Sequence, residues 1–263
     1  TQEIEIASLA FATNNKLLNV GPTGCGKTLM FEYLASKLGR PYLRVEHNQN
    51  FSYEQVFGQV HLNATDKGTE TEFIEGVIPK SMELPSIVVL DETSRNTGHA
   101  NILYQRLLDR GEMSLYEIKD GKGVKVAHKD WIICGTDNTK GNGDDMDKYS
   151  ASNVQDQAFV NRFDIIIEST YLSKDSEVAL IKKLSPDMDD RVASSLAKFS
   201  FLMHQGFSSG EITTAFSPRN LSAICRLYNT GLSLQQAIQM NYISRCSKSE
   251  VSDVKECYTS IFS

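Results

Sequence analysis

The sequence lacks most of the features that mark secreted, zinc-binding and membrane proteins. Its five cysteines are an odd set without a C-x-x-C pair, so they suggest neither a disulfide framework nor a zinc site. The five histidines are scattered without metal-ligand spacing. No apolar run approaches the roughly 18 to 20 residues that span a bilayer, and no secretion signal opens the chain. We therefore expect a soluble, cytoplasmic protein with reduced thiols.

Positive charge is also in deficit. Lysine and arginine number 27 against 33 aspartates and glutamates, which gives a formal net charge of −6. This balance disfavours a surface dedicated to non-specific nucleic-acid binding, although it does not exclude a local basic patch. The apolar fraction of 40% is sufficient for a hydrophobic core, and 263 residues suit one large domain or a core with a smaller lobe.

One segment carries a strong phosphate-binding motif. Residues 21–28 fit the pattern G-x-x-x-x-G-K-[ST], and the apolar run Leu17–Val20 leads directly into it. The glycines let the backbone curl so that successive N–H groups point at phosphate oxygens, and the following helix adds its positive end. The predicted nucleotide-binding residues are Gly21, Pro22, Thr23, Gly24, Cys25, Gly26, Lys27 and Thr28.

Two of these side chains have specific expected roles. Lys27 would reach the β and γ phosphates, and the Thr28 hydroxyl would bind the Mg²⁺ that bridges them. The sequence thus predicts a site for ATP with magnesium. Because the motif lies close to Thr1, the chain could be a part of a longer protein.

Apolar runs alternate with helical periodicity up to about residue 171. Strands are predicted at 17–20, 42–45, 86–90, 131–134 and 164–168, with helical stretches at 29–38, 97–110 and 154–161. Runs that are apolar throughout are typical of parallel strands buried on both faces. We therefore predict an α/β fold with a parallel five-stranded sheet covered on both faces by helices.

Two insertions interrupt this alternation, and the end of the chain departs from it. Residues 61–76 and 113–128 have the patterns of inserted β-hairpins, the second turning at Asp120-Gly121. Helical periodicity then fills 173–184, 188–205, 218–230, 233–244 and 249–262. We predict an α/β nucleotide-binding core of residues 1–171 followed by a small α-helical lid domain of residues 172–263.

An acidic pair follows the third predicted strand. Asp91, at the carboxyl end of that strand, can hold Mg²⁺ together with Thr28, and Glu92 beside it can polarise an attacking water. The pair favours ATP hydrolysis over phosphoryl transfer to a substrate. The alternative is an acidic pair that only ends a strand.

Three further side chains are candidates because of their positions. Asn138 follows the fourth predicted strand and could orient the same water. Arg162, near the fifth strand, could supply charge to a neighbouring subunit's nucleotide, and Arg219 could do so within its own subunit. Taken alone, Asn138 could equally be a turn residue, and each arginine a solvated surface residue.

In this order the motifs resemble those of the AAA+ ATPases, especially the MoxR group and its CobS-type ATPase subunit of cobaltochelatase. The resemblance covers roughly residues 17–260. Its more family-specific parts are Thr71–Gly76 with Pro79, Arg95 after the acidic pair, Gly141–Asp144, Gln155–Ala158 ahead of Asn161–Phe163, and Ser217–Arg219.

The resemblance implies a ring-forming ATPase, expected to be a hexamer, with nucleotide bound between subunits. The two hairpins match the helix-2 insert and the pre-sensor-1 hairpin, which engage partners or substrate in such rings. A partner with a von Willebrand factor A domain is typical of the group. The roles implied are Walker A for Lys27 and Thr28, Walker B for Asp91 and Glu92, sensor 1 for Asn138, arginine finger in trans for Arg162, and sensor 2 in cis for Arg219.

The leading hypothesis is therefore an ATP-driven motor that remodels a bound protein, with metal insertion into a macrocycle as one pathway it could serve. A nucleic-acid-associated motor or loader is a second reading, which stimulation by DNA or RNA would favour and the acidic net charge disfavours. An ATP-gated scaffold with negligible turnover is a third, against which the Asp91-Glu92 pair argues. A small-molecule kinase is the least favoured reading, because the chain continues into a helical lobe with a sensor-like arginine and not into a lid that closes over a substrate.

Overall fold

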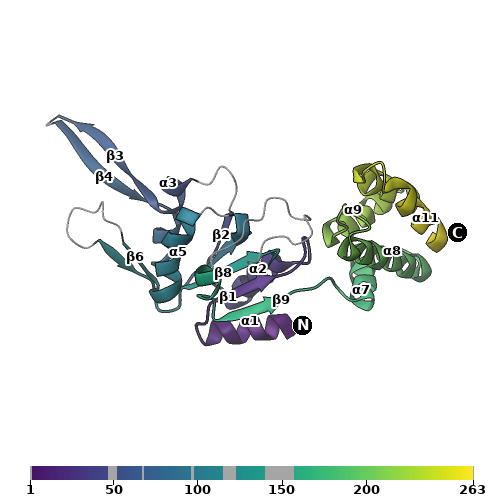
Figure 1. Ribbon diagram of the computed structural model, residues 1–263, viewed down its shortest axis with the longest axis horizontal. Coiled ribbons are helices and arrows are strands. Elements are labelled where there is room, and N and C mark those ends of the chain that lie inside the picture. Colours follow the sequence, from purple (N-terminus) through teal and green to yellow (C-terminus); the bar gives the residue numbers. More distant parts are fainter. Residues whose placement is uncertain are drawn as a thin grey trace. The chain divides into compact units, whose positions relative to one another are not determined.

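The computed structural model describes residues 2–46, 52–66, 68–95, 98–114, 123–139 and 157–262 (Figure 1). The chain divides into two compact units. The sheet unit comprises Thr1–Gly21 and Lys27–Ser169, and the helical unit comprises Pro22–Gly26 and Thr170–Ser263. The short segment Pro22–Gly26 is thus grouped with the C-terminal helices.

A parallel five-stranded sheet forms the centre of the sheet unit. Its strands run in the order β2-β5-β8-β1-β9, and every neighbouring pair is parallel. The carboxyl ends of the strands therefore share one edge of the sheet, which we call the carboxyl edge. The strands are β1 (Leu17–Val20), β2 (Tyr42–Glu46), β5 (Ile87–Asp91), β8 (Ile132–Asp137) and β9 (Ile165–Glu168).

The five predicted strands are confirmed, and three of them, β2, β5 and β8, end later than the apolar runs indicate. β5 includes Asp91, which is in register with Glu46 of β2. β8 continues through Asp137, which is in register with Val20 of β1. Polar residues that the pattern places after strands are thus held by the ladder itself.

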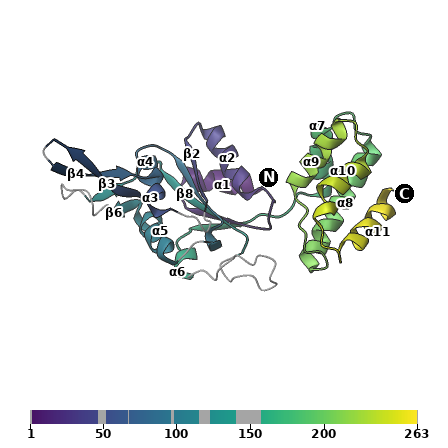
Figure 2. The ribbon, with the colours of Figure 1, turned by 90° about the horizontal axis from the view of Figure 1, so that it is seen from above.

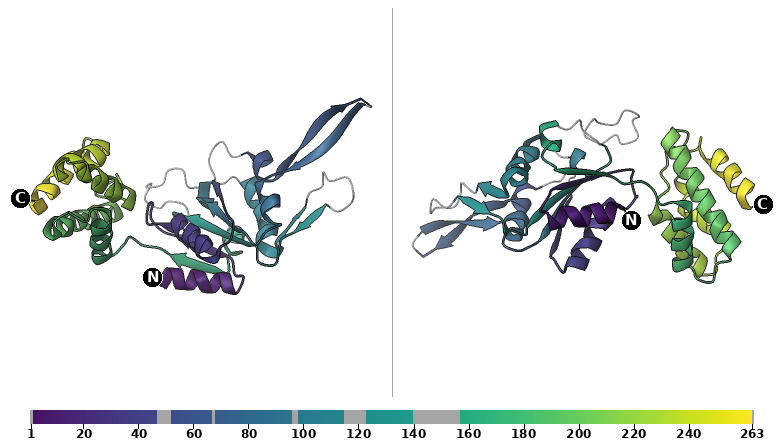
Figure 3. Two further views of the ribbon diagram at one scale, coloured as in Figure 1. Left: turned by 180° about the vertical axis from the view of Figure 1, so that it is seen from behind. Right: turned by 90° about the horizontal axis from the view of Figure 1, so that it is seen from below.

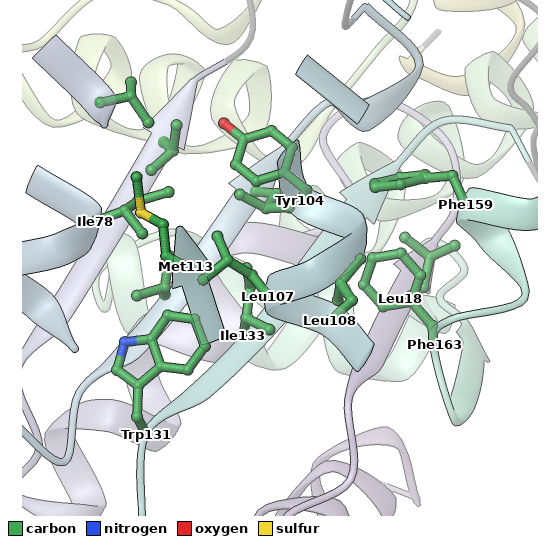
Figure 4. Close-up of a cluster of buried hydrophobic side chains, with 14 of the residues drawn as sticks. Leu18, Ile78, Tyr104, Leu107, Leu108, Met113, Trp131, Ile133, Phe159 and Phe163 are labelled. Carbon is green, nitrogen blue, oxygen red and sulfur yellow. The ribbon is translucent and has the colours of Figure 1, made fainter. Parts of the chain in front are cut away.

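Side chains alternate along the buried strands and form a hydrophobic cluster on each face. On one face, Leu18 and Ile133 pack with Tyr104, Leu107 and further large side chains (Figure 4). On the other face, neighbouring strand residues pack against α1 (Gln2–Ala12) and α2 (Lys27–Leu38). Figure 2 shows α1 and α2 on one side of the sheet and α5 (Gly98–Arg110) on the other. This two-sided covering agrees with the predicted α/β fold.

The sheet unit has one further long helix, α1, which the sequence patterns do not indicate, and several short helices. α1 is not predicted, although its Ala7, Ala10 and Phe11 are buried against the sheet. The helix predicted at 154–161 is α6, described from Gln157 onward. The short elements are α3 (Tyr53–Val56), α4 (Val77–Ser81), the 3-10 turn η1 (Thr93–Arg95) and α6 (Gln157–Val160).

Two antiparallel hairpins are inserted between elements of the sheet unit, as predicted. The first pairs β3 (Gly58–Thr65) with β4 (Gly68–Glu75) and extends away from the sheet (Figures 1 and 3). The second pairs β6 (Glu112–Ser114) with β7 (Val124–Val126). The predicted turn at Asp120-Gly121 and the family-like residues 141–144 lie outside the described residues.

A cation on the second hairpin joins it to the base of the first. The Lys125 Nζ lies 2.5 Å from Glu75 Oε2 and 2.7 Å from Glu83 Oε1. Glu75 ends β4, and Glu83 follows α4. These ion pairs link the second hairpin to the end of the first and to the segment after α4.

The C-terminal part of the helical unit packs its helices around a second hydrophobic core. Large buried side chains at its centre include Phe199, Phe216 and Tyr242. Asp189 accepts a hydrogen bond from Arg191 N at the start of α8, at 2.8 Å, which stabilises that helix end. The elements are α7 (Lys174–Leu184), α8 (Asp190–Ser209), α9 (Pro218–Asn229), α10 (Leu234–Asn241), the 3-10 turn η2 (Ile243–Arg245) and α11 (Val251–Phe262). None of the described helices is long and apolar enough to cross a membrane.

Candidate functional site

Lys27 lies buried at the first turn of α2, where β1 and β8 end. Its side chain is only slightly exposed, and its Nζ donates to the Gly21 carbonyl at 2.7 Å and to Asn138 Oδ1 at 2.9 Å. Both of these acceptors are uncharged oxygens, so these two contacts do not neutralise the ammonium. A buried ammonium held this way is suited to an anionic ligand, since burial strengthens its attraction for opposite charge.

Asp91 receives hydrogen bonds on both carboxylate oxygens at the end of β5. The Thr28 hydroxyl donates to Oδ1 at 2.8 Å, and the Thr136 hydroxyl donates to the same oxygen. The Arg44 Nε donates to Oδ2 at 2.8 Å. Burial acts to raise the pKa of Asp91, but the donors Thr136, Thr28 and Arg44 outweigh it and hold that pKa below its ordinary value. The carboxylate is therefore charged at neutral pH.

Glu92 adopts a backbone conformation that is rare for residues other than glycine. Its φ is 55°, and its N–H donates to Thr136 Oγ1 at 3.2 Å. Its carboxylate is partly exposed and pairs with Arg95, with Oε2 2.8 Å from Nη1. Backbone strain of this kind is maintained by surrounding contacts and often accompanies a functional role. Thr136 thus fixes both acids, because it donates to Asp91 and accepts from Glu92.

A buried carboxyl at the end of β8 fixes the backbone around Asn138. Asp137 Oδ1 accepts from Ser94 Oγ at 2.6 Å and from Asn138 N at 2.7 Å, while Oδ2 accepts from Thr93 Oγ1 at 3.0 Å. Burial raises the pKa of Asp137, and these donors reduce the rise. Asp137 therefore connects η1, which follows Glu92, to Asn138, which contacts Lys27.

Within the sheet unit, these side-chain contacts join the expected residues in two pairs, Lys27 with Asn138 and Thr28 with Asp91. Glu92 is linked to Asp91 through Thr136. Arg162 makes different contacts: its Nε lies 3.0 Å from Asp109 Oδ1, and a guanidinium nitrogen donates to the Ala158 carbonyl. No contact between Arg162 and Lys27, Thr28 or Asp91 is seen in the described part of the chain.

The other expected residues are grouped with the helical unit. Arg219 lies exposed in the first turn of α9 and makes no hydrogen bond or ion pair with the residues that the structure describes. In the segment Pro22–Gly26, Gly24 has φ 84° and Gly26 has φ 98°. Both values require the conformational freedom of glycine, as the predicted phosphate-binding bend does.

The donor set suits a magnesium ion beside a triphosphate. Mg²⁺ prefers oxygen ligands and is usually bound by one or two protein oxygens together with phosphate oxygens. The Thr28 hydroxyl donates its proton to Asp91, so its oxygen lone pairs stay available to a metal. The oxygens of Thr28 and Asp91 therefore fit magnesium, and the Lys27 ammonium fits the phosphates.

Comparison with known proteins identifies the family of the chain. A family model described as AAA domain (dynein-related subfamily) matches residues 16–163, which is more than half of the chain. The chain belongs to this AAA family. The match contains Gly21–Thr28, Asp91, Glu92, Asn138 and Arg162, while Arg219 lies beyond it.

Relatives of this AAA chain confirm the resemblance to the MoxR group and the CobS type. The aerobic cobaltochelatase subunit CobS of Sinorhizobium sp is 26% identical over 267 residues, which cover 99% of this chain and 80% of the relative. Protein CbbQ of Hydrogenophilus thermoluteolus is 30% identical over 131 residues, which cover 50% of this chain and 47% of the relative. A RuvB mutant of Thermotoga maritima has a similar fold, with a TM-score of 0.57 at 14% identity over 91% of this chain and 69% of that chain.

Three contributors to the site of this AAA protein are absent from the sequence predictions: Arg44, Thr136 and Asp137. Arg44 lies inside a strand, and Thr136 and Asp137 lie beyond the apolar run that marks β8. The only sequence signal is a set of polar residues in or directly after predicted strands. That signal becomes specific only when strand order and register are known.

Proposed function

We propose that the protein binds ATP with magnesium and hydrolyses it, and that it does so in an oligomeric ring that remodels a partner protein. The observation that carries this proposal is the contact between Thr28 and Asp91 beside the buried Lys27. Membership of the AAA family and the CobS and CbbQ relatives support it.

Each side chain at the carboxyl edge has a distinct proposed role. Lys27 would exchange its two carbonyl-type acceptors for β- and γ-phosphate oxygens, and Asn138 would remain beside it. Thr28 and Asp91 would hold magnesium. Magnesium supplies positive charge that stabilises the phosphate oxygens during phosphoryl transfer.

Glu92 is the proposed base for hydrolysis. Its side chain is 34% exposed, so it is accessible to a water molecule, and Arg95 pairs with its carboxylate. A carboxylate within hydrogen-bonding reach of water can accept a proton as the oxygen attacks phosphorus. The backbone of Glu92 is constrained at the carboxyl end of β5, directly after Asp91, and Thr136 accepts its N–H.

The ring and its partner extend this proposal. We infer a hexamer in which Arg162 of one subunit reaches the nucleotide of its neighbour, and in which Arg219 acts on the nucleotide of its own subunit. In the single chain Arg162 is paired with Asp109, so the arginine would exchange this carboxylate for a phosphate on assembly. The proposed partner is a protein with a von Willebrand factor A domain.

Phosphate release by the purified protein tests the hydrolytic role. Glu92→Gln removes the proposed base and leaves the shape of the side chain, so turnover should fall at least about 100-fold while ATP binding persists. Lys27→Ala should lose both. Glu5→Gln, which changes an exposed glutamate on α1, is the matched control and should behave as the wild type. Wild-type turnover by Glu92→Gln would refute the role given to that carboxylate.

Mixing variants tests the shared site. Arg162→Ala subunits and Lys27→Ala subunits should each be inactive alone and should regain part of the activity when mixed. Recovery is expected because some interfaces then combine an intact P-loop with an intact Arg162. No recovery in mixed rings of confirmed composition would place Arg162 outside a neighbour's site.

A further inference from the structure

Arg44 is a cation held directly on the proposed magnesium ligand. It lies on β2, where Nη2 is 2.5 Å from Asp91 Oδ2 and Nε donates to the same oxygen at 2.8 Å. The same Nη2 is 2.8 Å from Glu46 Oε1. One guanidinium therefore bridges a buried carboxylate at the site and a second carboxylate two residues along its own strand.

The two oxygens of Asp91 are engaged in different ways. Oδ1 accepts the hydroxyls of Thr28 and Thr136, and the Thr28 contact leaves that hydroxyl oxygen able to bind a metal. Oδ2 is engaged by the positive charge of Arg44. A divalent cation and a guanidinium repel each other and compete for the same carboxylate charge. The first contact is compatible with magnesium, whereas the second opposes it.

The Arg44 side chain is also exposed enough to leave Asp91. Its side chain is 39% exposed, and the Glu46 side chain is 57% exposed, whereas Asp91 is only 6% exposed. The guanidinium can therefore move away from the buried carboxylate without losing its contact with Glu46 or its access to water. An exposed pair of this kind costs little to form or break.

We propose that Arg44 is a positioning residue that acts as a cationic latch on Asp91, opposing magnesium binding until the guanidinium is released onto Glu46. This inference rests on the proposed function, because it concerns the affinity of the same site for magnesium. The latch holds the Asp91 carboxylate in place when magnesium is scarce, and it sets the magnesium concentration at which the site fills.

Fluorescent ATP binding titrated with magnesium tests the latch without relying on turnover. Arg44→Met removes the charge and keeps most of the side-chain length, so the half-saturating Mg²⁺ concentration should fall about tenfold. Glu46→Gln removes the carboxylate that would hold the released guanidinium, so it should raise the half-saturating Mg²⁺ concentration about threefold. Nucleotide affinity in the presence of a chelator is measured for both variants, so that any change in affinity for the nucleotide itself is separated from the change in magnesium dependence.

Arg40→Met is the matched control, since Arg40 precedes the same strand and its Nη1 donates to the Asp130 carbonyl instead of to Asp91. Its magnesium dependence should equal that of the wild type. Arg44→Met with unchanged or higher half-saturating Mg²⁺ would overturn the latch, as would opposite behaviour of Glu46→Gln. If the wild type binds no nucleotide in chelator or in magnesium, the proposed function fails instead.

Discussion

Buried carboxyl groups occur in both units, and the hydrogen-bond donors around them differ. In the sheet unit, Asp91 and Asp137 lie at the carboxyl edge and accept hydrogen bonds from hydroxyl, amide or guanidinium donors on both oxygens. In the helical unit, Glu250 is similarly surrounded by donors, whereas Glu177 is not. The comparison shows that burial alone does not decide the charge state of a carboxyl, because the donors around it offset burial to a different extent at each site.

The two glutamates of the helical unit give the clearest contrast. Burial acts to raise the pKa of Glu250, but donors from Thr213, Ser247 and Thr214 lower it to about 2. Burial raises the pKa of Glu177 to about 7, and only the Ser200 hydroxyl, at 2.9 Å, acts against it. Glu177 Oε2 has no hydrogen-bond partner among the described residues. Glu250 is therefore charged in the folded protein at neutral pH, and we call it the structural anion. The folded structure favours the protonated form of Glu177.

The largest expected effect is the loss of the structural anion. Since the pKa of Glu250 is lower in the folded than in the unfolded chain, its stabilisation is present above about pH 4.5 and is lost as the pH falls towards 2. Glu250→Gln should destabilise the helical unit by about 3 kcal/mol at pH 7 and by less at pH 3. Urea unfolding followed by circular dichroism measures this.

A matched control is the exposed Glu256 on α11, whose Gln variant should unfold as the wild type does. The single tryptophan, Trp131, belongs to the sheet unit, so its fluorescence follows the other unit in the same titration. A Glu250→Gln loss that is equal at pH 7 and pH 3 would break the comparison.

The opposite sign is expected for Glu177. Its pKa is raised on folding, so its contribution to stability is present below about pH 4.5 and is lost as the pH rises through about 7. Glu177→Gln, which stays neutral, should stabilise the helical unit by about 2 kcal/mol at pH 8, with a smaller gain at pH 5. Circular dichroism of urea unfolding at the two pH values measures the gain, and destabilisation at pH 8 would contradict this account.

The smallest effect is expected at Asp137. Burial raises the pKa of this carboxyl although Ser94, Asn138 and Thr93 donate to it, so charge contributes less there than at Glu250. Asp137→Asn keeps the shape and one acceptor, and should cost about 1 kcal/mol in the transition followed by Trp131 fluorescence. A loss as large as that of Glu250→Gln would show that both buried acids act as anions.

The sequence predicted the elements that depend on local pattern. Four of the five apolar runs lie within a residue or so of the strands that form, and the G-x-x-x-x-G-K-[ST] motif lies between β1 and α2. Asp91 could be selected because it ends an uninterrupted apolar run, which local spacing reveals. The hairpins were predictable for the same reason, since strand patterns and turn residues are local signals.

The missing parts of the site depend on register and packing. Gly135 breaks the apolar run of β8 and suggests that the strand ends, yet the strand continues because residues 135–137 pair with β1. Glycine is needed at position 135 because a Cβ there would meet the side chains of Leu18 and Phe163. Thr136 and Asp137 therefore lie outside the predicted strand. Arg44 contacts Asp91 only because β2 lies beside β5, and neither the pairing nor its register can be inferred from spacing. The Asp109 partner of Arg162 is equally non-local.

Calorimetry of ATP binding with magnesium tests the central claim most directly. The account predicts saturable binding by the folded wild-type protein and its loss in Lys27→Ala, with unfolding of Lys27→Ala by urea checked against the wild type. Absence of ATP binding by the folded wild-type protein in magnesium would contradict the account.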